Sequence, residues 1–196
     1  MKSIRVAVAV AALGVAVTAC SSPVQAGSAA IVGNERIAAS DLNTHVKQLE
    51  EALVKAKIPQ SQLQLPVTQY VLLQMVNVEQ FRQLAAKAGA RVTDGEIDQF
   101  IAAQGGLEAL EQKTLVQGVP PAYTRQWLGT SIAISKLMQQ YGGGTDQAAQ
   151  QRGQERLIKE AAAIKITYSP RYGTFDPNKG FVDAGRFGRP AAAAQG

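Results

Sequence analysis

The stretch AAIVGNERIAASDL, residues 29–42, predicts a short β hairpin that leads directly into a helix. Residues 31–32 and 36–37 suit extended backbone, and the Gly-Asn pair at 33–34 tolerates the positive φ angles of a tight turn. Ser40 is the expected N-cap of the helix that follows. A two-stranded hairpin placed before a helical chain needs a further strand as its partner.

A second β segment is predicted at the far end of the helical region. In IKITY, residues 164–168, apolar Ile164, Ile166 and Tyr168 alternate with polar residues, which is the period of a half-buried strand. The most economical partner for this strand is the segment 31–37. Their pairing would bring the two ends of the fold together.

Apolar periodicity predicts six helices between these β segments. The first ends before Pro59, and the second runs from near Pro66 to Ala88, where Gly89 stops it. The expected core residues of these two helices are Leu42, Val46, Leu49, Leu53, Val67, Val71, Leu72, Met75, Val76, Val78, Leu84 and Ala85.

The later helices have clear start and stop residues. Thr93 and Glu96 fit a capping box, which predicts a third helix with Ile97, Phe100 and Ile101 facing inward. A short fourth helix carries leucines and ends at Gly118. Pro121 opens the fifth helix, because proline at the first helical position gives up a donor that had no partner. The sixth is a polar helix over residues 145–163, and its expected apolar anchors are Leu157 and Ile158.

These elements predict a mostly α fold. Short connections between the helices favour an antiparallel bundle. A short β pairing between the N-terminal and C-terminal segments closes it. We expect one compact domain over residues 29–180 and a disordered tail over 181–196, where Gly, Pro and Ala dominate.

The start of the chain predicts export. Residues 1–19 contain two cations followed by the apolar run 6–17, which has the length of a signal-peptide core and is too short to span a bilayer. The tetrapeptide VTAC at 17–20 resembles a bacterial lipobox, in which the cysteine becomes the acylated N-terminus. Cys20 is therefore the expected lipidation site. The alternative is a conventional signal peptide cleaved after Ala26.

A lipid on Cys20 would hold the protein at the outer face of the cell membrane. Each buried methylene contributes about 0.8 kcal/mol, so two acyl chains anchor stably where one is marginal. Residues 20–28 form a short polar tether that reaches at most roughly 30 Å. We expect an extracytoplasmic lipoprotein of the cell envelope whose folded part works close to the membrane.

Composition and motifs exclude several classes of protein. Removing residues 1–19 takes away two cations and no acid, so the net charge falls from +5 to +3, and no basic stripe remains for nucleic acid. A single cysteine and the single His45 cannot form a thiolate zinc site or a two-histidine metal site. Motifs for a nucleophile elbow or a phosphate loop are missing. We expect no enzyme, no cofactor and no metal.

Four segments together resemble the SurA and PrsA type of extracytoplasmic foldase. They are the opening stretch, VTDGEIDQFI at 92–101, the helix end KLMQQYGG at 136–143, and IKITYSPRYGTFDP at 164–177. The resemblance covers residues 29–180 and implies a SurA N-terminal-like helical domain. Larger members carry a parvulin isomerase domain where this chain has only Gly142 to Thr145, so the resemblance implies a chaperone module without isomerase activity.

Such a module would bind exposed apolar segments of unfolded or exported polypeptides. Aromatic and methionine side chains adapt to varied partners. The candidate contacts are Tyr70, Met75, Phe81, Tyr123, Trp127 and Met138, for each of which core packing is the alternative. Tyr123 and Trp127 are the best candidates for an open groove, and Tyr172 and Phe175 are expected to fasten the C-terminal segment. The alternative function is a structural or adaptor lipoprotein that binds one specific envelope partner.

Overall fold

The computed structural model describes residues 26–176 and 179–182. The predicted signal peptide, the lipidation site Cys20, most of the tether and the tail from residue 183 lie outside the described residues. For these segments the predictions stand untested by the structure.

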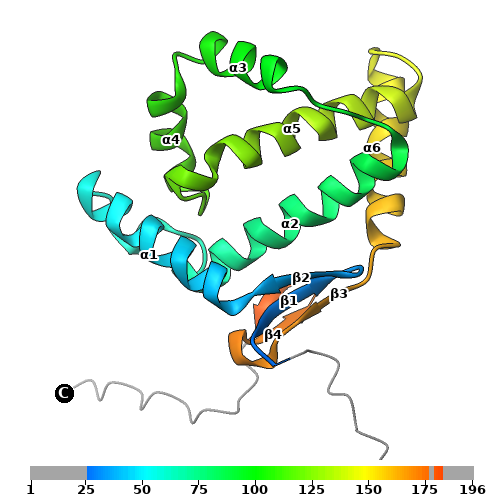
Figure 1. Cartoon of the computed structure of the whole chain (residues 1–196). Helices are drawn as coiled ribbons and strands as arrows, with labels where there is room; N and C mark the ends of the chain where they lie inside the picture. The colour runs from blue at the N-terminus through cyan, green and yellow to red at the C-terminus, as the bar shows by residue number, and fades with distance from the viewer. Residues whose placement is uncertain (1–25, 177–178, 183–196) are drawn as a thin grey trace, which may run out of the picture.

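The predicted pairing between the two ends of the domain is confirmed. Strands β1 (Ser28–Val32), β2 (Glu35–Ala38) and β3 (Ile166–Tyr168) form one antiparallel sheet in the order β2-β1-β3. Ile31 lies opposite Thr167. Figure 1 shows this sheet below α2, with the N-terminal and C-terminal segments side by side. The central strand thus joins residues that are more than a hundred positions apart.

The hairpin turn requires its glycine. Gly33 has φ +58°, a region that favours glycine. A Cβ placed there would lie against the Gln83 side chain, which donates to the carbonyl of Val32 at 2.8 Å. The turn is therefore pressed against the second helix and held there by a hydrogen bond.

All six predicted helices are present within the described residues. They are α1 (Ala39–Lys55), α2 (Val67–Ala88), α3 (Asp94–Ala103), α4 (Leu107–Leu115), α5 (Pro121–Gly142) and α6 (Gln147–Ala162). Two single-turn 3₁₀ helices cover Gln60–Gln62 and Pro170–Tyr172, and a second small sheet pairs β4 (Thr174–Asp176) with β5 (Gly180–Val182).

Helix α2 is the centre of the molecule, with its apolar side chains in two core clusters. The main cluster joins the first half of α2 to α1 and the sheet, and Leu42, Leu49 and Val71 in it are fully buried. The second cluster lies between α2, α5 and α6, around Leu84 and Leu137. Of the predicted core residues of α1 and α2, all are buried except Val46, which packs against the main cluster.

Glutamine side chains of α2 donate hydrogen bonds to backbone carbonyls of other segments. Each side-chain amide donates to a carbonyl at the end of a different segment, which fixes those segments on one scaffold helix. The bonds are Gln69 to Tyr172 (2.9 Å), Gln74 to Gln117 (2.8 Å), Gln80 to Ala161 (2.9 Å) and Gln83 to Val32 (2.8 Å).

Helices α5 and α6 pack antiparallel at close range. A Cβ at Gly142 would overlap the backbone carbonyl of Ala149, and a Cβ at Gly153 would overlap that of Met138. Only a short turn joins the two helices, and its Gly143 has φ +73° with open space around it. Glycine at these positions allows the two helix backbones to touch.

Three local predictions are wrong. Helix α1 begins at Ala39 with Ala38 as N-cap, and Ser40 lies inside the first turn. Helix α3 starts at its predicted capping box, and Ile97 contacts α5 at Gly129, but no residue of the helix is fully buried and Phe100, predicted to face inward, is 37% exposed. In α6, Leu157 is buried as predicted, whereas Ile158 is 61% exposed because it lies on the outer face.

The ordered domain extends slightly beyond its predicted bounds. Ser28, assigned to the tether, is the first residue of β1. Phe181 and Val182, assigned to the tail, lie in β5 opposite Phe175 and Thr174. Residues 181–182 were assigned to the tail because the composition after residue 180 gives no sign of a strand. In the structure they pair with β4.

Candidate functional site

The six residues predicted to contact polypeptides lie on α2 and α5 but do not form one open groove. Met75 and Tyr123 are buried, at 7% and 8% exposure. The half-buried ones divide between the two core clusters: Tyr70 and Trp127 pack against the main cluster, and Phe81 and Met138 against the second. For Met75 and Tyr123 the prediction of an accessible groove is therefore corrected.

Tyr123 is buried because α1 packs over the start of α5. Its ring lies 4.8 Å from that of His45, a residue of α1 whose Nδ1 is 3.1 Å from the Gln48 side chain. Burial raises the pKa of the Tyr123 hydroxyl well above its ordinary value, mainly through desolvation. The pair behaves as core packing between two helices.

Trp127 has its polar atom satisfied inside the protein. The indole Nε1 donates to the Gln74 side chain at 3.1 Å, and Gln74 in turn donates to the carbonyl of Gln117. This chain of bonds holds the connection between α4 and α5 on α2. The tryptophan is therefore a structural link as well as a partly exposed aromatic surface.

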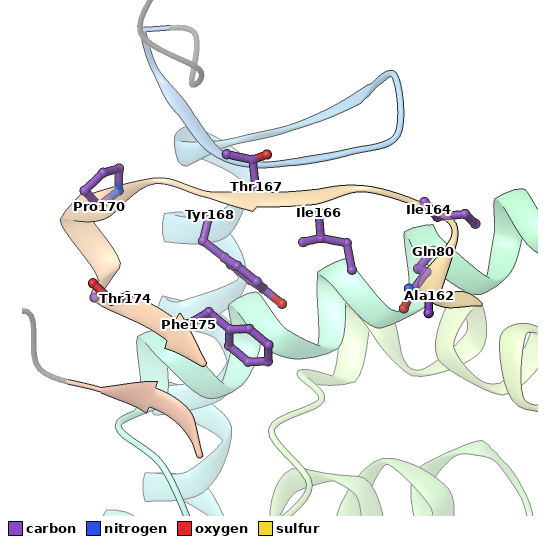
Figure 2. A pocket seen from close by; sticks show the side chains of 10 residues that line it. Gln80, Ala162, Ile164, Ile166, Thr167, Tyr168, Pro170, Thr174 and Phe175 are labelled. Atoms are coloured by element: carbon purple, nitrogen blue, oxygen red, sulfur yellow. The ribbon is translucent and has the colours of Figure 1, made fainter. Parts of the chain in front are cut away.

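A large apolar hollow lies at the sheet. It is a cavity of about 590 Å³ between α2, the end of α6, β3 and β4 (Figure 2). Ile166, Tyr168 and Phe175 point into it from β3 and β4, and Gln80 borders it from α2. We call it the sheet pocket, and its other lining residues are Ala162, Ile164, Thr167, Pro170, Gly173 and Thr174.

An aromatic cluster forms one wall of the sheet pocket. The ring of Tyr168 lies 4.7 Å from that of Phe175 and 5.1 Å from that of Phe181, and the two phenylalanine rings are 5.3 Å apart. Burial raises the pKa of Tyr168 to about 12. The hydroxyl thus stays neutral at physiological pH, so the wall is apolar and uncharged.

A second hollow lies between α1 and α4. It has a volume of about 520 Å³, and its lining includes the apolar residues Ala52, Leu107 and Leu115 and the charged residues Lys55 and Glu111. Leu107 is 38% exposed there. We call it the helical groove.

Exposed apolar side chains also occur on α3 and just after α4. Phe100 in α3 is 37% exposed and Val116, just after α4, is 41% exposed. Apolar surface of this kind often marks a binding region, although single exposed residues are ordinary. The α3-α4 part of the molecule therefore offers more uncovered apolar side chains than the α2 core.

The acidic residues of α3 are engaged in structure. Arg125 lies 2.7 Å from Asp98 and 3.5 Å from Asp94. The capping box pairs Thr93 with Glu96, and Lys136 forms an ion pair with the same Glu96. This carboxylate cluster caps a helix and fastens it to α5.

Over residues 26–176 and 179–182, His, Cys, Asp and Glu side chains form no group of three that could hold a metal ion. In the same part of the chain, every helix is too short or too polar to cross a membrane.

Sequence reasoning missed the sheet pocket as a site. The alternation in IKITY indicated that Ile164, Ile166 and Tyr168 share one face, but it did not indicate that β4 would wall off a space beneath that face. Phe175 was expected only to fasten the segment, and Phe181 was placed in the tail. The alternation was the one available signal, because the β4-β5 pair has no strong pattern of its own.

The comparisons with known proteins give one match. A family model described as SurA-like N-terminal domain matches residues 1–114. This span contains β1, β2 and helices α1 to α3, and it stops at the end of α4. No curated protein and no solved structure matches the chain.

Proposed function

The chain belongs to the SurA-like N-terminal domain family, and from this premise we propose that it is an extracytoplasmic, chaperone-like protein that binds exposed apolar segments of exported polypeptides. Its 196 residues show no parvulin domain, so we propose binding without isomerase activity. The sheet pocket is the observation that carries the proposal, because it offers an apolar space beside β3, which pairs with one strand alone in the described part of the chain.

The size of the sheet pocket suits weak and reversible capture. Burying one large apolar side chain contributes about 1.5–3 kcal/mol. Two or three such contacts give dissociation constants on the order of micromolar after the costs of ordering the segment. Such binding permits release without ATP.

We propose that a lipid on Cys20 anchors this domain at the outer face of the membrane. The support is the lipobox-like VTAC and the apolar run before it. The domain begins at Ser28, so the intervening residues keep it within roughly 30 Å of the bilayer. Cys20→Ala should move the protein from the membrane fraction to the soluble fraction without changing its fold, and an unchanged membrane fraction would contradict this proposal.

We also propose that the protein is not an enzyme. The support is that the groups most suited to proton transfer have structural partners. His45 packs on Tyr123, and the carboxylates of α3 bind Arg125 and Lys136. A proline-limited refolding reaction should therefore proceed at its uncatalysed rate in the presence of the purified chain.

The central test is aggregation of a chemically unfolded client. At near-stoichiometric ratio and without ATP, the purified chain should slow light scattering. Ala162→Glu puts a charge at the rim of the sheet pocket and should reduce this effect several-fold. Ala163→Glu is the matched control, since Ala163 is the exposed neighbour at the same helix end and does not line the pocket. Failure to protect any client would contradict the proposed function.

The second candidate function is a structural or adaptor lipoprotein with one envelope partner. The helical groove favours it, because charged Lys55 and Glu111 beside apolar lining residues suit a fixed partner better than varied clients. Cross-linking in cells followed by mass spectrometry separates the two. One dominant partner indicates the adaptor, and many exported chains indicate the chaperone.

A further inference from the structure

Among the strands of the described residues, β3 has a free edge. It is the outer strand of the β2-β1-β3 sheet, and the neighbouring β4 pairs with β5 and not with β3. An edge strand presents unpaired N–H and C=O groups that can pair with another extended chain. The sheet pocket includes β3 residues in its lining, so it opens beside this edge.

The register shows which backbone groups of β3 face outward. Ser169 donates to the carbonyl of Ala29 at 2.9 Å, and Gly33 donates to that of Lys165 at 2.8 Å. Thr167 is paired with Ile31 between them. Backbone N–H and C=O groups point to alternate sides along an antiparallel strand. The groups of Lys165, Thr167 and Ser169 therefore point to β1, and the N–H and C=O groups of Ile166 and Tyr168 point to the open edge.

The same two residues point their side chains into the sheet pocket. In Figure 2, Ile166 and Tyr168 point to the side of α2 and Phe175, whereas Thr167 points the opposite way. In an antiparallel pair, directly opposite residues have side chains on the same face. A segment bonded to Ile166 and Tyr168 would therefore place its own alternate side chains over the apolar pocket.

Two exposed cations flank β3. Lys165 directly precedes the strand and Arg171 follows it in the 3₁₀ turn. Neither has an ion-pair partner within the part of the chain that the structure describes. The ends of the edge are therefore positively charged, and this favours a partner with acidic residues beside its apolar ones.

We propose that an extended polypeptide segment adds as an antiparallel strand to the edge of β3, with alternate apolar side chains in the sheet pocket and acidic side chains beside Lys165 and Arg171. This inference rests on the proposed function and specifies how the segment binds. Only an extended backbone supplies donors and acceptors at the two-residue spacing of Ile166 and Tyr168, so the edge selects extended segments over helical ones.

The test uses the full chain and a fluorescently labelled nine-residue peptide in which valine and phenylalanine alternate with threonine between terminal aspartates. Ile166→Pro removes the outward N–H, whereas Ile166→Ala removes more of the side chain but keeps that N–H. In fluorescence anisotropy, Ile166→Pro should bind the peptide at least fivefold more weakly than Ile166→Ala, as expected for one lost hydrogen bond.

Peptide variants test the same geometry without changing the protein. N-methylation of the apolar residues should weaken binding at least tenfold, because their N–H groups point to β3. N-methylation of the threonines should have little effect, since those groups point away. Lysine in place of the aspartates should weaken binding several-fold, and this difference should vanish in the Lys165→Gln, Arg171→Gln double variant.

The outcomes separate the two proposals. If both methylated peptides bind alike and the two Ile166 variants bind alike, strand addition is overturned while polypeptide binding remains. If the chain binds neither the peptide nor any unfolded client, the proposed function fails together with this inference. Should Ile166→Pro not fold, the methylated peptides decide the question.

Discussion

At the scale of single residues, the structure depends on two kinds of residue. The first kind is glycine, which has no side chain and lets helices pack closely, and the second is a residue whose side chain makes several hydrogen bonds. Gln74 is an example of the second kind, because it accepts from Trp127 and donates to Gln117. Removing it would leave the part-buried indole N–H of Trp127 without this partner and would free the exposed carbonyl of Gln117. Glycines of α5 and α6 are examples of the first kind, since they allow backbone contact between the two helices.

Gly153→Ala should destabilise the protein in spite of the higher helix propensity of alanine. The propensity gain is at most about 1 kcal/mol. A Cβ at this position overlaps the Met138 carbonyl, which is backbone and cannot move away easily, and overpacking of this kind costs about 1–3 kcal/mol. Urea unfolding followed by the fluorescence of Trp127, the single tryptophan, measures the change.

Gly95→Ala is the control for this experiment. Gly95 also lies in a helix, has no positive φ, and its nearest neighbour atom would be 4.0 Å from the new Cβ. It should cause no loss of stability. If both alanine variants unfold at the same urea concentration as the parent chain, close contact between α5 and α6 is not required.

At the scale of elements, α3 differs from the other helices because polar contacts hold it. It has no fully buried residue, and the ion pairs of Arg125 and Lys136 join it to α5 beside the contact of Ile97 with Gly129. The pKa of Glu96 is lowered to about 2, first by its hydrogen bond with Lys136 and then by the backbone N–H of Thr93. The attachment of α3 to α5 should therefore depend on pH and on salt concentration.

Acid should loosen α3 before the rest of the bundle. Because folding lowers the pKa of Glu96, its stabilising effect is fully present above the ordinary carboxyl value and is lost as the pH falls toward 2. Carbon-detected NMR should find the Glu96 pKa near 2, and Lys136→Met should raise it. A pKa in the ordinary range for glutamate in the parent chain would contradict the role of Lys136.

The sequence predicted most of the elements but less of their surroundings. Periodicity, Thr93 with Glu96, and the glycine and proline positions located all six helices, because those signals act within one or two turns. The same signals could not show that α3 lies at the outside of the bundle, since burial of Ile97 and Phe100 depends on what packs over them. For the sheet pocket, the alternation in IKITY indicated the apolar face but not the second sheet below it.

At the scale of the whole molecule, one strand pair closes the fold. Residues 28–32 and 166–168 are separated by the entire helical bundle, yet they share the central ladder of the sheet. The family model ends at residue 114, and the structure shows that the first strand pairs with a segment beyond it. The N-terminal half therefore relies on the C-terminal segment for its sheet.

Thr167→Pro should lower the stability of the whole domain, unlike Ile166→Pro. The N–H of Thr167 faces β1, so proline removes a ladder hydrogen bond and leaves the buried strand with an unmet acceptor, at a cost of about 1–3 kcal/mol. Thermal unfolding by circular dichroism compares the two variants. Equal melting temperatures would contradict the register, in which the N–H of Thr167 points to β1 and the N–H of Ile166 points to the open edge.

The position of the sheet has a mechanical consequence. The chain enters the domain at β1, and β1 is bonded directly to β3, the strand that borders the sheet pocket. Tension between a segment held at β3 and an anchor before β1 would act first on the hydrogen bonds between these two strands. Because β1 also packs in the main core cluster, the helices behind it would support the strand against that force.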